Sequence, residues 1–242
     1  MESIAICIPV RYGSSRLPGK PLLKLGDKTI IELTIQRALL CPDIVPSQIF
    51  IFTDDQRIAD VVKSKTSVNI IMTDSDCPNA LYRLSKYIHL VPQKYTGFIN
   101  LHGDEPFLDH RNLHHLIKEY LACKKTCILI KKSDNNMTHN SEVKAVTDTN
   151  MNMLYCSRSV IPYPAKNHQN HQYYGVIGLQ AMDRDTLKKY DQCPTPPHGW
   201  LYQVEDIEEL KILEIGQSIH CSLAPYPTTR SLNTLEDYQY FL

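Results

Sequence analysis

Ile4-Ala-Ile-Cys-Ile-Pro-Val10 is an apolar run that leads directly into the loop Arg11-Tyr-Gly-Ser-Ser-Arg-Leu-Pro-Gly-Lys20. A continuous apolar run of this length predicts a strand buried in a parallel sheet. The loop gathers three cations, Arg11, Arg16 and Lys20, and its glycines and serines let the backbone bend and supply small donors. Backbone N–H groups and cationic side chains that converge in this way suit a polyphosphate ligand.

The same loop has a simpler interpretation as a solvated basic segment, because basic loops are common on protein surfaces. Its glycine spacing fits neither the Walker P-loop nor the dinucleotide fingerprint. The preceding strand and the Ser14-Ser15-Arg16 core favour the phosphate-binding interpretation.

Apolar runs and helical patterns alternate after this loop. Such alternation predicts βαβ units, a mostly parallel sheet and a doubly wound α/β fold. Ligands of these sheets bind beyond the carboxyl ends of the strands, where both the basic loop and residues 102–105 should lie. The predicted strands are Ile4–Val10, Ile49–Thr53, Asn69–Met72, Gly97–Leu101 and Cys127–Ile130, and the predicted helices are Thr29–Leu40, Asp55–Lys65, Asn79–Val91 and Asp109–Ala122.

The second half of the chain is less regular. Helical periodicity predicts one helix over Val204–Ile215 that stops at Gly216, and Thr234 opens a short last helix with a capping-box pattern. We expect residues 1–242 to form a single domain, with 143–197 as a small inserted part. The predicted strands of this half are Val143–Thr147, Met153–Ser157 and Tyr174–Ala181.

Composition narrows the range of partners. Lys+Arg and Asp+Glu number 26 each, so no overall charge favours nucleic acid or a membrane surface. No apolar run approaches the length that spans a bilayer, and the early arginines argue against a signal peptide. Among eight scattered cysteines, Cys123 and Cys127 are close in sequence but lack partner histidines, which argues against zinc. Free thiols in strands indicate a reducing, cytoplasmic compartment.

Gly103-Asp104-Glu105-Pro106 follows a predicted strand at the same edge of the sheet as the basic loop. A carboxylate there can bind Mg²⁺, which neutralises and orients a triphosphate. Alone, the motif favours a simple aspartate turn before the helix at Asp109. The nearby basic loop favours Asp104 as a metal ligand.

The loop resembles the nucleotide-binding signature of the CMP-Kdo synthetases (3-deoxy-manno-octulosonate cytidylyltransferases). The likeness continues in family order through LHGDEPFL (101–108), VKAVTD (143–148), LYCSRSVIPY (154–163), YYGVIGL (173–179) and VEDIEELKILEIGQSIH (204–220). The resemblance implies a Rossmann-like nucleotidyltransferase fold and a Mg²⁺-dependent reaction in nucleotide sugar and lipopolysaccharide biosynthesis. A sugar hydroxyl would attack the α-phosphorus of CTP, and pyrophosphate would leave. The resemblance also implies a homodimer formed through the inserted part.

The resemblance also implies roles for individual residues. Arg16 and Lys20 would hold the β- and γ-phosphates, Arg11 the α-phosphate region, and Asp104 with Asn233 the metal. The catalytic set is therefore Arg11, Arg16, Lys20 and Asp104. The implied nucleotide-binding residues are Pro9, Arg11, Ser14, Ser15, Arg16, Lys20, Asn79, Arg83 and His102, and the implied sugar-binding residues are Lys144, Arg158, Tyr173, Glu208 and Glu209.

Several positions depart from the family pattern. Asn233 replaces a second metal aspartate, and Pro78-Asn79-Ala80-Leu81 replaces a Ser-Gly-Thr segment that reads the base. His102 and Glu209 each replace a glutamine. A negative Glu209 in the acceptor pocket would favour an amino-substituted ulosonic acid over the plain sugar.

These departures leave alternatives open. Arg158 has a second interpretation as a surface arginine after a strand. The Glu208–Glu209 pair has a second interpretation as part of a solvated helix face. For the whole chain, the alternatives are a nucleotide-sugar-binding homologue that has lost turnover and a nucleotidyltransferase for another base or acceptor.

Overall fold

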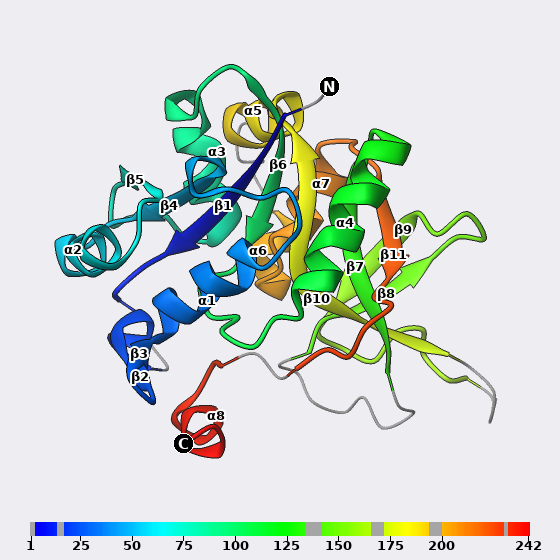
Figure 1. Ribbon diagram of the computed structural model, residues 1–242. Helices are drawn as coiled ribbons and strands as arrows, with labels where there is room; N and C mark the ends of the chain where they lie inside the picture. The colour runs from blue at the N-terminus through cyan, green and yellow to red at the C-terminus, as the bar shows by residue number, and fades with distance from the viewer. Residues whose placement is uncertain (1–2, 14–16, 134–141, 166–171, 194–199, 230–231) are drawn as a thin grey trace.

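In the computed structural model the described residues are 3–13, 17–133, 142–165, 172–193, 200–229 and 232–242 (Figure 1). Within them, one nine-stranded sheet forms the centre of the molecule, with main-path order β11-β7-β10-β6-β1-β4-β5. The strands of that path are β1 (Ser3–Val10), β4 (Ile49–Thr53), β5 (Asn69–Met72), β6 (Tyr95–Leu101), β7 (Thr126–Ser133), β10 (Tyr173–Asp183) and β11 (Ile219–Leu223).

Alternation along β1 creates two cores. Ile4, Ile6 and Ile8 contribute to one apolar cluster, whereas Ala5 and Cys7 contribute to the other. Successive side chains of a strand point to opposite faces, so a fully apolar strand requires cover on both. Full burial of one isoleucine side chain contributes about 1.5–3 kcal/mol. Helices α1 (Ile30–Leu39), α2 (Gln56–Lys65) and α4 (His110–Cys123) cover the first face, and α3 (Ala80–Tyr87), α5 (Arg184–Gln192) and α7 (Glu209–Glu214) cover the second.

The sheet is mostly parallel, as the sequence predicted. β1 pairs in parallel with β4 and β6, β4 with β5, and β7 with β11. Along the main path β10 is the exception, because it runs antiparallel between β6 and β7. The predicted strands and the first four predicted helices are present with ends that differ by a few residues, and the last turn of the Asn79–Val91 helix is a 3-10 segment, Ile88–Leu90.

The prediction of a single helix over Val204–Ile215 was wrong. The structure has two short helices, α6 (Leu201–Glu205) and α7, separated by Asp206 in the left-handed conformation with φ of 54°. Apolar periodicity continues through this break, which is why the pattern did not show it. The predicted stop is correct, since Gly216 has a positive φ of 76° after α7.

The division of the chain into one domain with an insertion at 143–197 stays a prediction. Within that range β8 (Lys144–Thr147) and β9 (Met153–Ser157) form an antiparallel hairpin off the main strand path, attached to β10. β10 itself lies inside the central sheet. The hairpin of β2 (Lys24–Leu25) and β3 (Lys28–Thr29), helix α5 and strand β11 were not predicted.

The chain ends with helix α8 (Leu235–Tyr240), which Thr234 opens by a capping box as predicted. Figure 1 shows α8 near the β2–β3 hairpin, away from the sheet. The Tyr238 hydroxyl donates to the Lys24 carbonyl at 2.7 Å, and Leu232 packs with Leu17 and Ile30. The last segment therefore lies against the loop that follows β1. Among the helices described here, none has the length and hydropathy to cross a membrane.

Candidate active site

The basic loop and the Asp104 turn meet at the carboxyl edge of the sheet. β1 and β6 are parallel neighbours, so the segments that follow them emerge side by side. Lys20 Nζ lies 2.5 Å from Asp104 Oδ2 and donates to the Leu232 carbonyl at 2.9 Å. The Leu232 N–H faces the Asp104 carbonyl at 3.4 Å. One ammonium thus joins three segments that are far apart in the sequence.

This pair is only partly buried, with side-chain exposures of 12% for Lys20 and 23% for Asp104. Burial raises the pKa of Asp104, but the charges of Lys20 and His102 outweigh it, so the pKa lies below its usual range. Asp104 is therefore ionised at neutral pH and carries an anionic oxygen at the crevice. Gly103 permits this approach, because a Cβ there would lie 3.2 Å from the Pro9 carbonyl.

The rest of the phosphate loop is described only at its two ends. Ser14, Ser15 and Arg16 lie outside the described residues, and Arg11 is exposed. Gly19 has a φ of 68° and its N–H donates to the Tyr12 carbonyl at 3.1 Å, which closes the loop on itself. The Tyr12 ring lies between Gly19 and the Arg57 guanidinium, which is 3.5 Å from the ring centroid.

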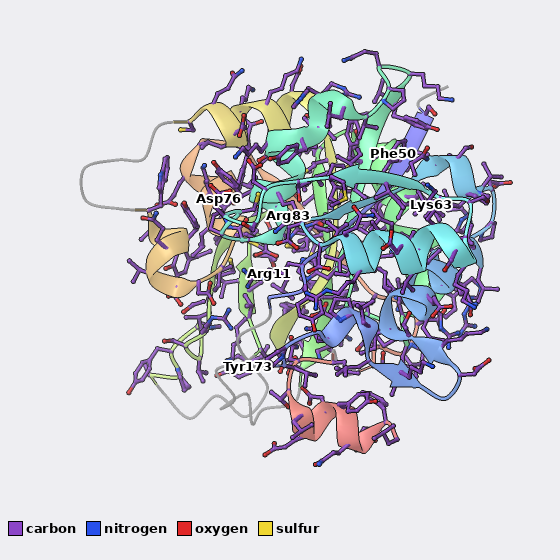
Figure 2. The ribbon with its side chains drawn as sticks, turned by 90° about the vertical axis from the view of Figure 1, so that its left-hand side faces the viewer. Arg11, Phe50, Lys63, Asp76, Arg83 and Tyr173 are labelled. Atoms are coloured by element: carbon purple, nitrogen blue, oxygen red, sulfur yellow. The ribbon has the colours of Figure 1, made fainter. Side chains whose placement is uncertain are left out.

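Asp54 is a site residue that the sequence analysis missed. Its carboxylate lies 3.0 Å from Arg83 Nη2, and its other oxygen accepts the Tyr12 N–H at 3.4 Å. Arg83 also donates to the Asp74 carbonyl at 3.0 Å and is 2% exposed. Figure 2 labels Arg83 and Arg11 on the side of the molecule that it turns toward the viewer. The position of Asp54 directly after β4, at the carboxyl edge, was the available signal.

Asn79 is the N-cap of α3. Its side-chain oxygen accepts the Tyr82 N–H at 2.7 Å. Capping by an asparagine side chain stabilises a helix by about 1 kcal/mol. Because the side-chain oxygen caps the helix, the predicted contact of Asn79 with the base would use its side-chain amide nitrogen.

His102 and Glu208 form a polar contact beside the Asp104 turn. Their Nε2 and Oε1 atoms are 3.2 Å apart, and the other oxygen of Glu208 accepts the Leu81 N–H at 2.8 Å. Desolvation lowers the pKa of His102, but the hydrogen bond and charge of Glu208 outweigh it and raise the pKa to about 9. Gly178 leaves room for the ring, because a Cβ there would lie 3.0 Å from its Nδ1. Glu208 is thus partnered by protein groups.

Glu209 points into the same polar cluster, where Gln180 Nε2 donates to its Oε1 at 2.6 Å. The residue is 7% exposed. Burial and the neighbouring charge of Glu208 raise the pKa of Glu209, while His102 opposes the shift. A protonated carboxyl has nearly the shape and hydrogen-bonding groups of the glutamine that the resemblance places here. The substitution is therefore less disruptive than a permanent charge.

Lys144 and Arg158 lie together at the β8–β9 hairpin. The buried Lys144 donates to the Arg158 carbonyl at 2.8 Å, and its pKa is lowered by burial. Arg158 Nε and Nη2 donate to the carbonyls of Glu205 and Asp206 at 2.9 and 2.7 Å. Its guanidinium thus closes the end of α6, and its role toward a sugar carboxylate stays a prediction.

Tyr173 is separated from the Glu208–Glu209 pair. It opens β10 opposite Ser133, whereas Gln180, which contacts Glu209, stands seven residues later. At about 3.3 Å per strand residue this is roughly 20 Å along β10. Tyr173 and the glutamate pair therefore do not share one contact shell in this structure.

Asn233 follows Leu232, whose backbone contacts both Lys20 and Asp104, so Asn233 lies beside this pair. Among the residues described, no group of three or more His, Cys, Asp or Glu side chains gathers as a metal cage. One carboxylate and one amide oxygen still fit Mg²⁺, which commonly takes one or two protein ligands together with substrate phosphates. Asp237 is already engaged, since it accepts the N–H groups of Asn233 and Thr234 at 2.9 and 2.8 Å.

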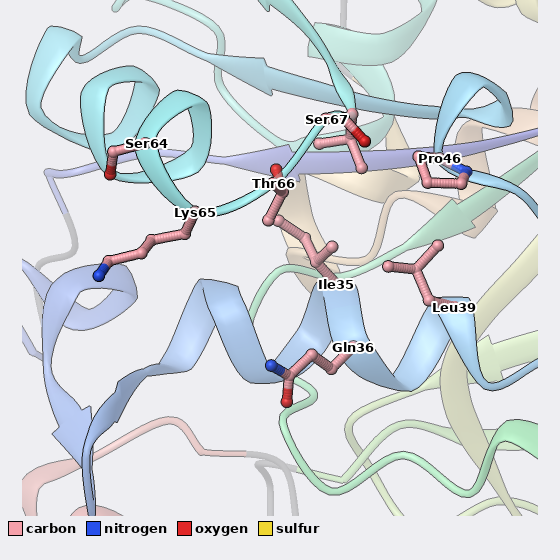
Figure 3. A pocket seen from close by; sticks show the side chains of 9 residues that line it. Ile35, Gln36, Leu39, Pro46, Ser64, Lys65, Thr66 and Ser67 are labelled. Atoms are coloured by element: carbon pink, nitrogen blue, oxygen red, sulfur yellow. The ribbon is translucent and has the colours of Figure 1, made fainter.

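A cavity of about 480 Å³ lies elsewhere, between α1 and the end of α2. Figure 3 shows Ile35 and Leu39 on α1 extending toward Thr66 and Pro46. Thr66 precedes β5, so this cavity lies at the amino edge of the sheet, opposite the Asp104 turn. None of the predicted site residues that the structure describes lines it.

Comparison with known proteins identifies relatives of this arrangement. A family model described as cytidylyltransferase matches residues 5–219. The 3-deoxy-manno-octulosonate cytidylyltransferase of Escherichia coli is 34% identical over 224 residues, which cover 90% of this chain and 87% of that protein. The 8-amino-3,8-dideoxy-manno-octulosonate cytidylyltransferase of Shewanella halifaxensis is 28% identical, with coverage of 97% and 95%.

A solved structure agrees with these matches. It is a CMP:2-keto-3-deoxy-manno-octonic acid synthetase complexed with CTP, and it superposes with a TM-score of 0.88 at 31% identity. The alignment covers 99% of this chain and 96% of that one. Because sequence and fold agree along almost the whole chain, it belongs to the cytidylyltransferase family, and within it to the CMP-Kdo synthetases.

Proposed function

We propose that this chain transfers CMP from CTP to a 3-deoxy-ulosonic acid, 3-deoxy-manno-octulosonate or its 8-amino relative, and releases pyrophosphate. The observation that carries the proposal is the contact of Lys20 with Asp104 and the Leu232 carbonyl. It joins the phosphate loop, the Asp104 turn and the C-terminal segment at the carboxyl edge of the sheet. The relatives named above carry the same activity in their names.

The protein's part in this reaction is positioning and charge neutralisation. Arg11, Arg16 and Lys20 would hold the triphosphate so that the bond to the leaving pyrophosphate lies opposite the attacking sugar hydroxyl. Lys20 would exchange some of its contact with Asp104 for phosphate oxygens. Asp104 and Asn233 would hold Mg²⁺, which supplies charge neutralisation and lowers the pKa of the hydroxyl.

The base would lie toward Arg83, whose position is fixed by Asp54. Because Asp54 also accepts the Tyr12 N–H, one carboxylate sets the distance between the arginine and the phosphate loop. The acceptor would approach from the side of Glu208, which His102 and the Leu81 N–H hold in place. The Glu208 carboxylate, paired with His102, would thus lie at the acceptor end.

A homologue that binds nucleotide without turnover is the second candidate, and Asn233 favours it. Loss of one anionic ligand weakens Mg²⁺ binding. A thermal-shift panel of CTP, UTP, ATP and GTP with Mg²⁺, followed by a pyrophosphate-release assay with both acids, separates the candidates. The proposal requires stabilisation by CTP above the other nucleotides and acid-dependent release. Binding without release supports the second candidate, and preference for another nucleotide supports a different transferase.

Competition between the two acids in one reaction then identifies the acceptor. A Glu209 that is charged in the complex would favour the amino-bearing acid, and we expect its CMP product to dominate. Glu209→Gln should shift the product ratio toward the plain sugar if Glu209 is charged in the complex, because unpaired charges discriminate strongly. A mixture dominated by the plain sugar in the parent protein would refute the amino-sugar preference.

A further inference from the structure

Cys123 and Cys127 bring two sulfur atoms together at the turn between α4 and β7. All eight cysteines lie within the described residues and all are free thiols. The two Sγ atoms of this pair are 3.0 Å apart. A disulfide requires about 2.0 Å between sulfurs, so a shift of about 1 Å joins them.

The turn itself explains the meeting. Lys124 has a φ of 57° and its N–H donates to the Tyr120 carbonyl at 2.9 Å, which ends α4 and reverses the chain. Cys123 is the last residue of α4, and Cys127 is the second residue of β7. The contact is therefore built by backbone geometry on both sides.

The two thiols differ in access. Cys123 is partly exposed and Cys127 is fully buried. The Lys125 N–H points at Cys123 Sγ at 3.4 Å. Burial, together with the neighbouring sulfur, raises the pKa of Cys127, so Cys123 is the thiol that meets a reagent first.

Three of the other cysteines lie on the opposite face of the sheet from Cys127. Cys127 belongs to the apolar cluster on the α4 face of the sheet, whereas Cys7, Cys156 and Cys221 belong to the cluster on the opposite face. The sheet therefore separates Cys127 from these three thiols. If Cys123 is oxidised, the sulfur in contact with it, and so available to form a disulfide, is that of Cys127.

We propose that Cys123 and Cys127 form a redox-active dithiol that a low-molecular-weight disulfide oxidises to an intrachain disulfide. The Cys123 thiolate attacks the reagent, a mixed disulfide forms at Cys123, and one reagent thiolate leaves. Cys127 then attacks the Cys123 sulfur, its proton passes to the second reagent thiolate, and that group leaves as a thiol. Two protein thiols are oxidised and one reagent disulfide is reduced to two thiols.

The test uses the whole protein with glutathione disulfide, followed by alkylation of remaining thiols and tryptic digestion. Cleavage at Lys118, Lys124, Lys125 and Lys131 separates the two cysteines, so the oxidised form yields the peptides 119–124 and 126–131 joined by a disulfide. We expect this linked pair to accumulate and to disappear on treatment with dithiothreitol. In denaturant, the oxidised protein should lose two of its eight titratable thiols.

Three serine variants make the result specific. Cys127→Ser should trap glutathione on Cys123 as a stable mixed disulfide, Cys123→Ser should leave Cys127 unmodified, and Cys193→Ser, a partly exposed control, should form the linked pair like the parent. The proposal fails if the folded parent protein retains all eight thiols, if glutathione stays on Cys123 with Cys127 intact, or if Cys123 links to another cysteine. The parent readout does not depend on how well the variants fold.

Discussion

Arg16 stands at the centre of the cationic loop, between Arg11 and the well-placed Lys20. A charge-assisted hydrogen bond to phosphate is worth about 1.5–3 kcal/mol. We therefore expect Arg16→Ala to raise the dissociation constant for CTP by about tenfold or more and to abolish turnover. Titration calorimetry with CTP measures the first effect. Lys63→Ala, an exposed cation on α2, is the matched control, and unchanged CTP affinity in Arg16→Ala would refute a phosphate role for this residue.

Asn233 concerns the metal rather than the phosphates. Asn233→Asp would add an anionic oxygen beside Asp104, so the Mg²⁺ concentration for half-maximal pyrophosphate release should fall. Asp104→Asn should remove most of the activity, whereas the exposed Asp76→Asn should not. An unchanged Mg²⁺ titration in Asn233→Asp would mean that residue 233 does not face the metal, despite its place next to Leu232.

At the scale of elements, α7 carries two adjacent acids into a polar cluster against β6 and β10. Burial and Glu208 raise the pKa of Glu209, so the folded protein keeps this proton at pH values where the unfolded chain has lost it. The free energy of unfolding should therefore fall as pH rises from the ordinary carboxyl pKa of about 4.3 through the raised value.

Glu209→Gln removes this pH-dependent loss of stability, and it retains a side-chain oxygen that accepts the hydrogen bond from Gln180. In urea titrations we expect the free energy of unfolding of Glu209→Gln, relative to the parent protein, to rise as pH increases above the ordinary carboxyl pKa of about 4.3. Glu214→Gln, on the same helix, serves as a control for general charge effects. Equal pH dependence in the parent protein and in Glu209→Gln would show that Glu209 is not buried as an acid.

At the scale of the whole molecule, the hairpin part and α6 expose several large apolar side chains. Leu154, Tyr163 and Val204 are 63%, 82% and 82% exposed. We propose that this surface forms the homodimer, and we expect light scattering to give twice the monomer mass. Val204→Lys should weaken the dimer, and Leu90→Lys, 52% exposed on another part of the molecule, should not. A monomer at micromolar concentration would refute the proposal.

The positions of the strands along the chain and the convergence of Lys20 with Asp104 followed from local pattern, because apolar runs and the edge rule for parallel sheets are short-range signals. The break at Asp206 did not follow, since the apolar period continues across it. The role of Asp54 was missed because its partners, Tyr12 and Arg83, are 42 and 29 residues away. Arg158 donates to backbone carbonyls at the end of α6. This contact was missed for the same reason, because it joins residues that are far apart in the sequence.

The bond from Lys20 to the Leu232 carbonyl spans 212 positions of the chain. Proteins are made from the N-terminus, so an N-terminal part is available for folding before the rest is translated. On the ribosome, the neighbouring strands β1, β4, β5 and β6 are complete long before residue 232 is translated. The fold and the substrate crevice therefore mature at different times, and a nascent chain interrupted before Leu232 can form much of the central sheet without this wall of the crevice.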